Sequence, residues 1–270
     1  MSDNLYQLVR DAQRGDRVAL EQVVRNIQDS VHHLSMRMLV NPEDANDATQ
    51  EILILVITKL STFEGKSAFQ TWVYRVAVNY ILNAKKVSAR DLGLNFEMFQ
   101  TDLEAGLTAD ATLTAENSVL INELRIACTM AMLLCLDIKH RVAYVLGDIL
   151  ELNHNEAVEI LDISKENYRK RLSRARTDIL AFMSQSCGLV NENAKCACPR
   201  RLPTAMAMGR IRAEKLTYST NNAPTYTDVL AKTKKLETSL KALCLQNATP
   251  QFNSPKDFGS YISDMVEGNV

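Results

Sequence analysis

The stretch from Asn153 to Leu180 reads NHNEAVEILDISKENYRKRLSRARTDIL and predicts two helices joined by a short turn. Asn153 and Glu156 have the spacing of a helix N-cap and its reciprocal partner, because each can satisfy a free backbone amide of the first turn. Asp162 and Ile163 form the expected turn, and aspartate tolerates left-handed backbone geometry better than most residues. The pattern is that of a helix-turn-helix.

The second of these helices is predicted to have a buried side and a cationic side. Tyr168, Leu172, Ala175, Ile179 and Phe182 recur at spacings of three and four, which places them on one apolar stripe. Such a helix suits a DNA major groove, where residues near its start reach base edges and later ones grip phosphates. A helical hairpin with a solvated basic face is the alternative. The polar side carries Lys165, Arg169, Lys170, Ser173, Arg174 and Thr177.

The composition favours an all-α protein of about two domains, since only nine of the 270 residues are glycine and six are proline. The first residues are polar and amphipathic, without the apolar core of a signal peptide. No run approaches the roughly 18 apolar residues that a membrane span needs. We therefore expect a cytoplasmic protein with no membrane insertion.

Helical periodicity divides the chain into four parts. Residues 1–87 carry four predicted helices, and residues 88–112 lose the pattern and contain acidic but no basic side chains after Asp91. Residues 113–186 form a second helical block with breaks at Asp137, Asn153 and Ile163. Residues 187–270 form an extension with a cysteine cluster, one expected helix over 227–245 and a short helix near 261–266.

Two further patterns lie in the first block. PEDANDATQEI, residues 42–52, places Asp44, Asp47 and Glu51 on one helix face, with Gln50 alongside. STFEGKSAFQTWVYRVAVN, residues 61–79, gathers aromatic rings, including the chain's only tryptophan, among basic and amide groups. An acidic helix face alone is most often simply solvated, and aromatic side chains alone indicate core packing.

Together, three motifs in one order are specific. DANDATQEI, then FEGKSAFQTWVYRVAVN, then SKENYRKRLSRAR resembles the bacterial RNA polymerase sigma factors of the sigma-70 family, and within them the extracytoplasmic-function (ECF, group 4) type. The resemblance covers about Leu5 to Lys86 and Leu124 to Ser184. It implies a region 2 helical bundle in residues 1–87, an acidic linker over 88–112 and a region 4 helix-turn-helix domain in 113–186.

The resemblance also implies the roles of particular residues. Docking on the beta-prime clamp helices of core RNA polymerase, which also contacts such factors through its beta subunit, is assigned to Asp44, Asp47, Gln50 and Glu51. Recognition and melting of the minus-ten element of promoter DNA are assigned to Lys66, Ser67, Phe69, Thr71, Trp72, Arg75 and Asn79. Reading of the minus-thirty-five element is assigned to Lys165, Asn167, Arg169, Lys170, Arg171 and Arg174. Trp72 and Tyr74 fit an alternative role in the core.

The extension departs from simple members of this type, which end near Ser184. It begins SCGLVNENAKCACPRR, so Cys187, Cys196 and Cys198 lie within twelve residues. Close thiols in a reducing compartment suggest metal or redox chemistry before a disulfide. Zinc or another thiolate-bound metal is therefore a candidate at these three residues, although no cofactor is required. The extension could instead regulate, with the helix over 227–245 folding across the DNA-binding faces.

The predicted function is that of a transcription initiation factor that brings core RNA polymerase to specific promoters and helps melt the minus-ten element. The alternative is a stand-alone helix-turn-helix repressor or activator, which leaves the acidic face and the aromatic segment without a role. We do not expect an enzyme, because the sequence has no phosphate-binding glycine loop, nucleophile motif or histidine constellation. An anti-sigma factor is a further candidate partner.

Overall fold

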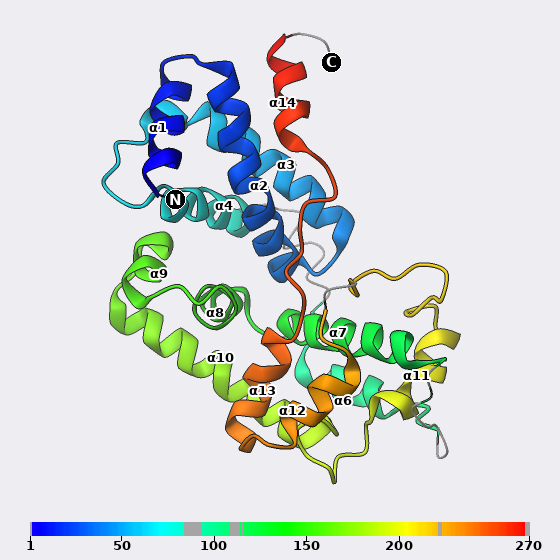
Figure 1. Cartoon of the computed structure of the whole chain (residues 1–270). Helices are drawn as coiled ribbons and strands as arrows, with labels where there is room; N and C mark the ends of the chain where they lie inside the picture. The colour runs from blue at the N-terminus through cyan, green and yellow to red at the C-terminus, as the bar shows by residue number, and fades with distance from the viewer. Residues whose placement is uncertain (1, 84–92, 109–113, 115, 221–222, 268–270) are drawn as a thin grey trace. The chain divides into compact units, whose positions relative to one another are not determined.

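The computed structural model describes residues 2–83, 93–108, 114, 116–220 and 223–267 (Figure 1). Within these residues every element of regular secondary structure is a helix, and β-pairing is limited to two isolated bridges. The all-α prediction is therefore confirmed. The chain folds as two compact units. Unit 1 takes the described residues of Met1–Arg90, Asn153–Lys165 and Phe252–Val270, and unit 2 those of Asp91–Leu152 and Glu166–Gln251.

Unit 1 is built around one long helix. Helix α2 (Arg17–Leu39) contacts α1 (Ser2–Gln13), α3 (Pro42–Thr58), α4 (Phe69–Asn83) and α14 (Phe258–Glu267). Its inward face buries Val24, Ile27 and Leu34 completely. Each such side chain contributes about 1.5–3 kcal/mol when it is removed from water. Helix α9 (His154–Leu161) completes the unit and contacts α4.

Capping residues fix where the helices of unit 1 begin. The Asp16 carboxylate accepts the N–H of Ala19 at the start of α2, 3.0 Å away. The Asn41 side chain accepts the amides of Glu43 and Asp44 at the start of α3, where Pro42 takes the first helical position. Proline suits that position because its missing N–H has no partner there in any case. The sequence therefore sets locally where α3 begins.

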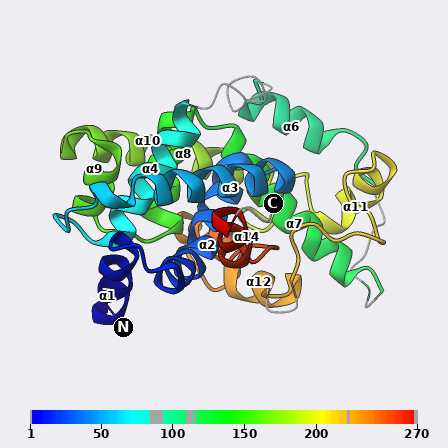
Figure 2. The same ribbon diagram turned by 90° about the horizontal axis from the view of Figure 1, so that it is seen from above.

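Unit 2 contains eight helical elements among its described residues. Most of α10 (Lys165–Ser186) lies here, and α11 packs against α7, as Figures 1 and 2 both show. The remaining elements are α6 (Phe96–Glu104), α7 (Ser118–Leu134), α8 (Ile138–Tyr144), the π-helical η2 (Val145–Ile149), α11 (Cys198–Ala207), α12 (Tyr226–Thr233) and α13 (Thr238–Asn247).

The structure differs from the sequence prediction in four places. Helix α6 lies inside the range predicted as a linker, where Phe99 stacks on Phe182 of α10 with ring centroids 5.4 Å apart. Helix α11 was not predicted. The single helix expected over 227–245 is two helices, α12 and α13, because the chain turns between residues 234 and 237. Helix α14 begins at Phe258, earlier than predicted.

The extension is joined to α7 by a buried carboxylate. Glu123 is 2% exposed and accepts the backbone amides of Thr217 and Ser219, each at 2.7 Å, and that of Tyr218 at 3.0 Å. Several N–H donors on one carboxylate offset the loss of its hydration. Residues 217–219 are thereby held in unit 2 although they form no helix.

Candidate polymerase and nucleic-acid interfaces

Helix α3 presents the predicted docking residues on its outer face. Ala45, Ala48, Ile52 and the other inward positions are buried, whereas Asp47 and Glu51 are exposed. Asp44 and Gln50 are half-buried. Within the described residues no salt bridge involves Asp47 or Glu51, so their carboxylates can receive basic groups of a partner.

Tyr80 of α4 lies close to this acidic face. Burial raises the pKa of its hydroxyl, and the charges of Glu51 and Asp47 raise it further. The carboxylates of α3 therefore act on the Tyr80 hydroxyl of α4. Tyr80 was not among the predicted site residues, and no local sequence pattern relates it to α3.

The aromatic segment forms a small core of its own. Phe63, Phe69 and Trp72 contact one another, with ring centroids 5.1 to 5.8 Å apart. Phe69 and Thr71, both predicted to bind DNA, are buried at 2% and 4% exposure, so their side chains pack inside unit 1. Tyr74 is also buried, as its alternative role in the core required.

Members of the segment that are half-buried or exposed line a cavity of about 470 Å³ between the end of α3, η1 (Leu60–Thr62) and α4. Trp72, Arg75 and Asn79 follow one another along α4 at helical spacing, so their side chains face the same space. The wall also includes an ammonium group and further amide and aromatic groups. The other lining residues are Leu55, Lys59, Thr62, Val76, Tyr80 and Asn83.

Arg75 has a carboxylate partner in the same unit. Its Nη2 lies 2.7 Å from Oε1 of Glu159 in α9, and its Nε donates to the Glu159 carbonyl at 3.1 Å. Both side chains are more than a third exposed, so solvent screens this pair. A DNA phosphate could replace Glu159 as the partner of Arg75.

The loop before α4 displays the two remaining predicted residues. Gly65 has a φ of +74°, which a side chain would strain, and it turns the chain ahead of Lys66. Lys66 is exposed and pairs with Glu64, while Ser67 is half-buried. Lys66 is thus placed at the surface near the N-terminal end of α4, and Ser67 follows it.

The predicted helix-turn-helix is confirmed in its local structure. Asn153 accepts the amides of Asn155 and Glu156, and the Glu156 carboxylate accepts the amide of Asn153 at 3.0 Å. Asp162 ends α9 in the left-handed conformation, with φ of 49° and ψ of 50°. Helix α10 begins three residues later at Lys165.

A buried side anchors α10 in unit 2. Tyr168, Leu172 and Ala175 are buried, as are Ile179 and Phe182 of the same predicted stripe. Arg176 adds an ion pair, in which its Nε and Nη2 donate to the Asp148 carboxylate at 2.8 and 2.6 Å. This bidentate hydrogen bond with Asp148 raises the pKa of Arg176. The pairing fixes the rotation of α10 about its axis.

The opposite side of α10 is cationic. Of the six residues assigned to minus-thirty-five reading, Arg171 is half-buried and the other five are exposed. Lys170 pairs with Glu166 and Arg174 with Asp178, each one helical turn away. Such exposed pairs contribute little, so phosphates can displace them. These side chains therefore lie on the side of α10 opposite its buried stripe, and their role in reading DNA stays a prediction.

The three cysteines predicted as metal ligands lie near one another in unit 2. Residues 187 and 196 form a β-bridge, and Cys198 begins α11. Burial raises the pKa of each thiol, to about 11 for Cys196, which favours the neutral form. Within the described residues no group of three or more Cys, His, Asp or Glu is arranged to hold a metal ion. A bound metal therefore stays a prediction.

Sequence comparison with known proteins identifies the same family that the three motifs indicated. The Sigma-70 region 2 family model matches residues 23–90. The ECF RNA polymerase sigma factor SigW of Bacillus subtilis is 30% identical over 171 residues, which cover 62% of this chain and 90% of that protein. The ECF RNA polymerase sigma-E factor of Haemophilus influenzae is 33% identical over 173 residues, covering 63% and 89%. A solved structure of CnrH with the cytosolic domain of CnrY has a TM-score of 0.47, 21% identity and coverage of 66% and 95%.

The chain belongs to the ECF sigma factors of RNA polymerase. It is therefore a transcription initiation factor that acts with RNA polymerase. Among the described residues, no helix is both long enough and apolar enough to cross a membrane.

Proposed function

We propose that the chain directs core RNA polymerase to a set of promoters through three separate surfaces, without catalysis of its own. Helix α3 docks on the polymerase, the cavity beside α4 receives a base of the minus-ten element, and α10 reads the minus-thirty-five element. The observation that carries the proposal is the cavity, because a stacking ring, a guanidinium and an amide surround one space of about 470 Å³.

The outer face of α3 suits the basic clamp helices of the beta-prime subunit. Asp47 and Glu51 are exposed carboxylates one turn apart, and Asp44 continues the acidic face toward the start of the helix. Charge complementarity of this kind accelerates and orients association more than it adds affinity. The beta subunit of the polymerase then contacts parts of the factor outside α3.

The α4 cavity suits an unpaired base. Melting a duplex costs unstacking energy, which a protein offsets by holding an extruded base against an aromatic ring and bonding its polar edge. Trp72 offers the ring, Asn79 has both a donor and an acceptor, and Arg75 holds the backbone once it leaves Glu159. Lys59, on the opposite wall, adds a second cation.

Helix α10 suits the intact DNA duplex upstream of the minus-ten element. Its exposed cations include Lys165 and Arg169 near the start of the helix, where base edges are within reach in a major groove. Arg174, two turns further along, is placed to contact phosphate. The same chain thereby grips paired DNA with one surface and unpaired DNA with another.

The test is run-off transcription and permanganate footprinting with core polymerase on genomic fragments, comparing the wild type with Asn79→Ala and Asn193→Ala. Asn193 is an exposed asparagine in a turn of the extension, and its alanine variant is the control. We expect Asn79→Ala to bind core polymerase normally and to open promoters about tenfold less, as the loss of a bidentate base contact predicts. The control should match the wild type.

Two results would contradict the proposal. Unchanged promoter opening in Asn79→Ala would remove the cavity from the melting step. Failure of the wild type to start RNA chains with core polymerase on any fragment, together with tight binding to duplex DNA by the factor alone, would favour the stand-alone repressor instead.

A further inference from the structure

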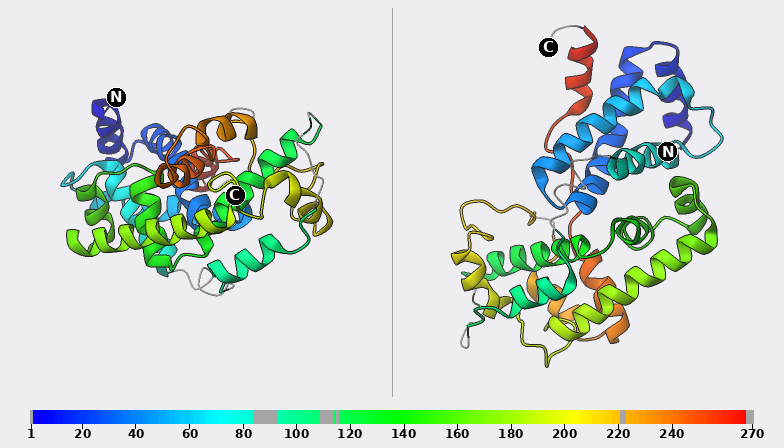
Figure 3. Two further views of the ribbon diagram at one scale, coloured as in Figure 1. Left: turned by 90° about the horizontal axis from the view of Figure 1, so that it is seen from below. Right: turned by 180° about the vertical axis from the view of Figure 1, so that it is seen from behind.

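The segment Phe252–Ile262, hereafter the C-terminal strap, lies along α2 of unit 1 (Figures 1 and 3). Three of its apolar side chains are buried there: Phe252 at 7%, Phe258 at 1% and Ile262 at 3% exposure. They recur along the strap and pack on helices that lie more than 200 residues earlier in the sequence. Burial of this extent identifies the strap as a docked element of unit 1.

Polar contacts fix the register of the strap on α2. Three α2 side chains accept strap amides at 2.9 Å each: Asp29 accepts that of Ser254, Gln28 that of Phe258, and Nδ1 of His33 that of Phe252. The His33 ring also stacks on the Phe252 ring, with centroids 5.8 Å apart. Because each amide bonds to one particular side chain, the strap can dock in only one position.

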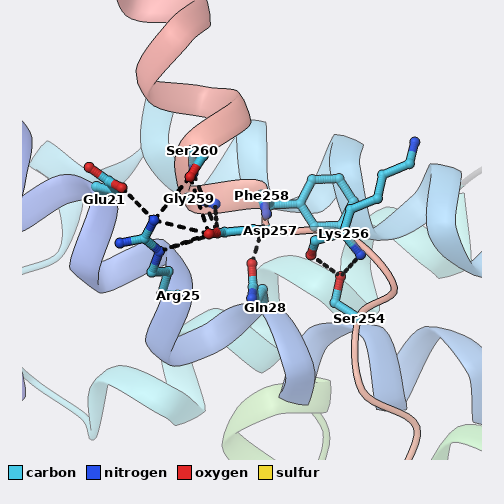
Figure 4. A network of polar contacts seen from close by, with 9 residues as sticks. All are labelled: Glu21, Arg25, Gln28, Ser254, Lys256, Asp257, Phe258, Gly259 and Ser260. Carbon is cyan, nitrogen blue, oxygen red and sulfur yellow. Dashed lines mark hydrogen bonds and ion pairs between the residues drawn. The ribbon is translucent and has the colours of Figure 1, made fainter.

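An ion pair holds the start of α14 against α2 (Figure 4). Nε of Arg25 donates to the Asp257 carboxylate at 3.1 Å, and Nη2 donates to it at 3.0 Å and to the Ser260 hydroxyl at 2.9 Å. Glu21 holds the same guanidinium from the other side at 2.7 Å. A Cβ added at Gly259 would lie 2.7 Å from Cγ of Arg25, so the backbone of α14 approaches the Arg25 side chain as closely as a glycine permits.

The strap also reaches α3. The Gln50 amide donates to the Tyr261 hydroxyl at 3.5 Å, a long contact that places the tyrosine beside the half-buried Gln50, next to the exposed Glu51. Gln50 is one of the four residues assigned to polymerase docking. A partner that bound the Gln50 amide would compete with Tyr261 for it.

We propose that the C-terminal strap is an intramolecular competitor of core RNA polymerase, which must leave Gln50 in the middle of α3 before the polymerase can dock fully. This inference rests on the proposed docking role of α3. Since only the undocked fraction is competent, the apparent dissociation constant for core polymerase equals the intrinsic constant divided by that fraction. Docking of the strap therefore sets how much of the factor is active.

The proposal differs from occlusion of the DNA-binding faces by the helix expected over 227–245. Here the covering segment is the C-terminal strap, which follows residues 227–245 in the chain. The interface that it covers is the predicted polymerase-docking face of α3 in the same unit. The strap carries its own release points, because the Arg25–Asp257 pair is about half exposed and open to competing ions.

The test measures the affinity of the full chain for core polymerase by fluorescence anisotropy. The variants are Gly259→Ala, Tyr261→Phe and the control Lys256→Gln. Alanine is a better helix former than glycine, so Gly259→Ala separates the strap from Arg25 without weakening α14 itself. Tyr261→Phe removes only the contact with Gln50. Lys256 belongs to the strap, but its hydrogen bonds with Ser254 use the backbone N–H and carbonyl of Lys256, which the substitution keeps.

We expect Gly259→Ala to bind core polymerase at least about fivefold more tightly than the wild type, within the range usual for coupled sites. Tyr261→Phe should bind more tightly by a smaller factor, and Lys256→Gln should match the wild type. Hydrogen exchange at the Phe258 amide should quicken in Gly259→Ala, which shows that the strap has left Gln28. Quicker exchange with no gain in affinity would overturn the proposal.

A reversible lock supplies the opposite perturbation. Because a Cβ at position 259 would lie 2.7 Å from Cγ of Arg25, the double variant Arg25→Cys with Gly259→Cys is designed to bring two thiols together for a disulfide. The oxidised form should bind core polymerase more weakly than the wild type and the reduced form more tightly. Equal binding by both forms would refute competition, whereas no binding by any form, the wild type included, would instead refute the docking role of the factor.

Discussion

His33 should make the stability of unit 1 sensitive to acid in a defined pH range. Its ring is 7% exposed, and its Nδ1 accepts the amide of Phe252, so protonation would place a donor opposite a donor. Burial, with smaller contributions from the nearby charges of Arg37 and His32, lowers the pKa of His33 from 6.5 to about 3. The folded state therefore keeps this histidine neutral where the unfolded chain protonates it.

The sign and size of the effect follow from this difference. Above a pH of about 6.5 both states carry a neutral ring, and His33 imposes no penalty. As the pH falls from 6.5 toward about 3, the unfolded state alone gains the proton, and unfolding becomes easier by about 1.4 kcal/mol per pH unit. Between pH 6.5 and 4.5 the expected loss is about 2.3 kcal/mol, because half of the unfolded rings already carry the proton at pH 6.5.

Urea denaturation of the full chain at several pH values measures this loss. The fluorescence of Trp72, the only tryptophan in the chain, reports on unit 1 because α4 belongs to that unit. The control variant is His33→Gln, whose amide oxygen can still accept the Phe252 amide but cannot be protonated in this range. The quantity of interest is the difference between the wild type and the variant at each pH.

A flat difference between pH 6.5 and 4.5 would refute the reasoning. It would mean either that the folded state admits a protonated His33 or that the bond to Phe252 does not form in solution. A difference that grows as the pH falls, in favour of the variant, would support both the buried neutral ring and the docked strap. His32, which is also buried with a lowered pKa, remains in both proteins and largely cancels.

Three further predictions concern α10 and the cysteines. Arg169→Ala should weaken binding of the holoenzyme to promoter DNA about tenfold in a mobility-shift assay, without changing the melting temperature, because its side chain is exposed. Arg176→Ala, on the same helix, should lower the free energy of unfolding by about 2 kcal/mol in a denaturant titration, since it leaves the buried Asp148 carboxylate without its guanidinium partner; unaltered stability would contradict the anchoring role. If the cysteines bind zinc, elemental analysis should find one zinc per chain in the wild type and none in Cys198→Ser. Wild-type protein that is folded but contains no zinc would exclude the predicted zinc site.

The helix-turn-helix could be predicted from the sequence because its determinants are local. Asn153 and Glu156 cap α9 through neighbouring amides, and the stripe that starts at Tyr168 needs only the helical repeat. The left-handed Asp162 is also a property of one residue and its neighbours. The faces of α3 and α10 followed from the same repeat.

Features that depend on distant partners were missed. Helix α6 spans nine residues and is held by long-range packing of Phe99 on Phe182, so its own pattern is too short to detect. Pro199 in the first turn of α11 and Pro203 in its interior concealed that helix. Lys59 at the end of α3 lines the same cavity as Asn79 of α4, and no regular spacing in the sequence relates the two residues. Phe69 was assigned to DNA by the family resemblance, which does not reveal that its ring is buried against Phe63 and Trp72.

The distance along the chain between α2 and the strap has a consequence for newly made protein. Asp257 is synthesised 232 residues after Arg25. At typical elongation rates of about 5–20 residues per second, this interval is on the order of 10–50 s. During that time the nascent factor presents the face of α3 without its later covering segment. Translation itself would then open a brief window in which a growing chain can engage polymerase before its own tail arrives.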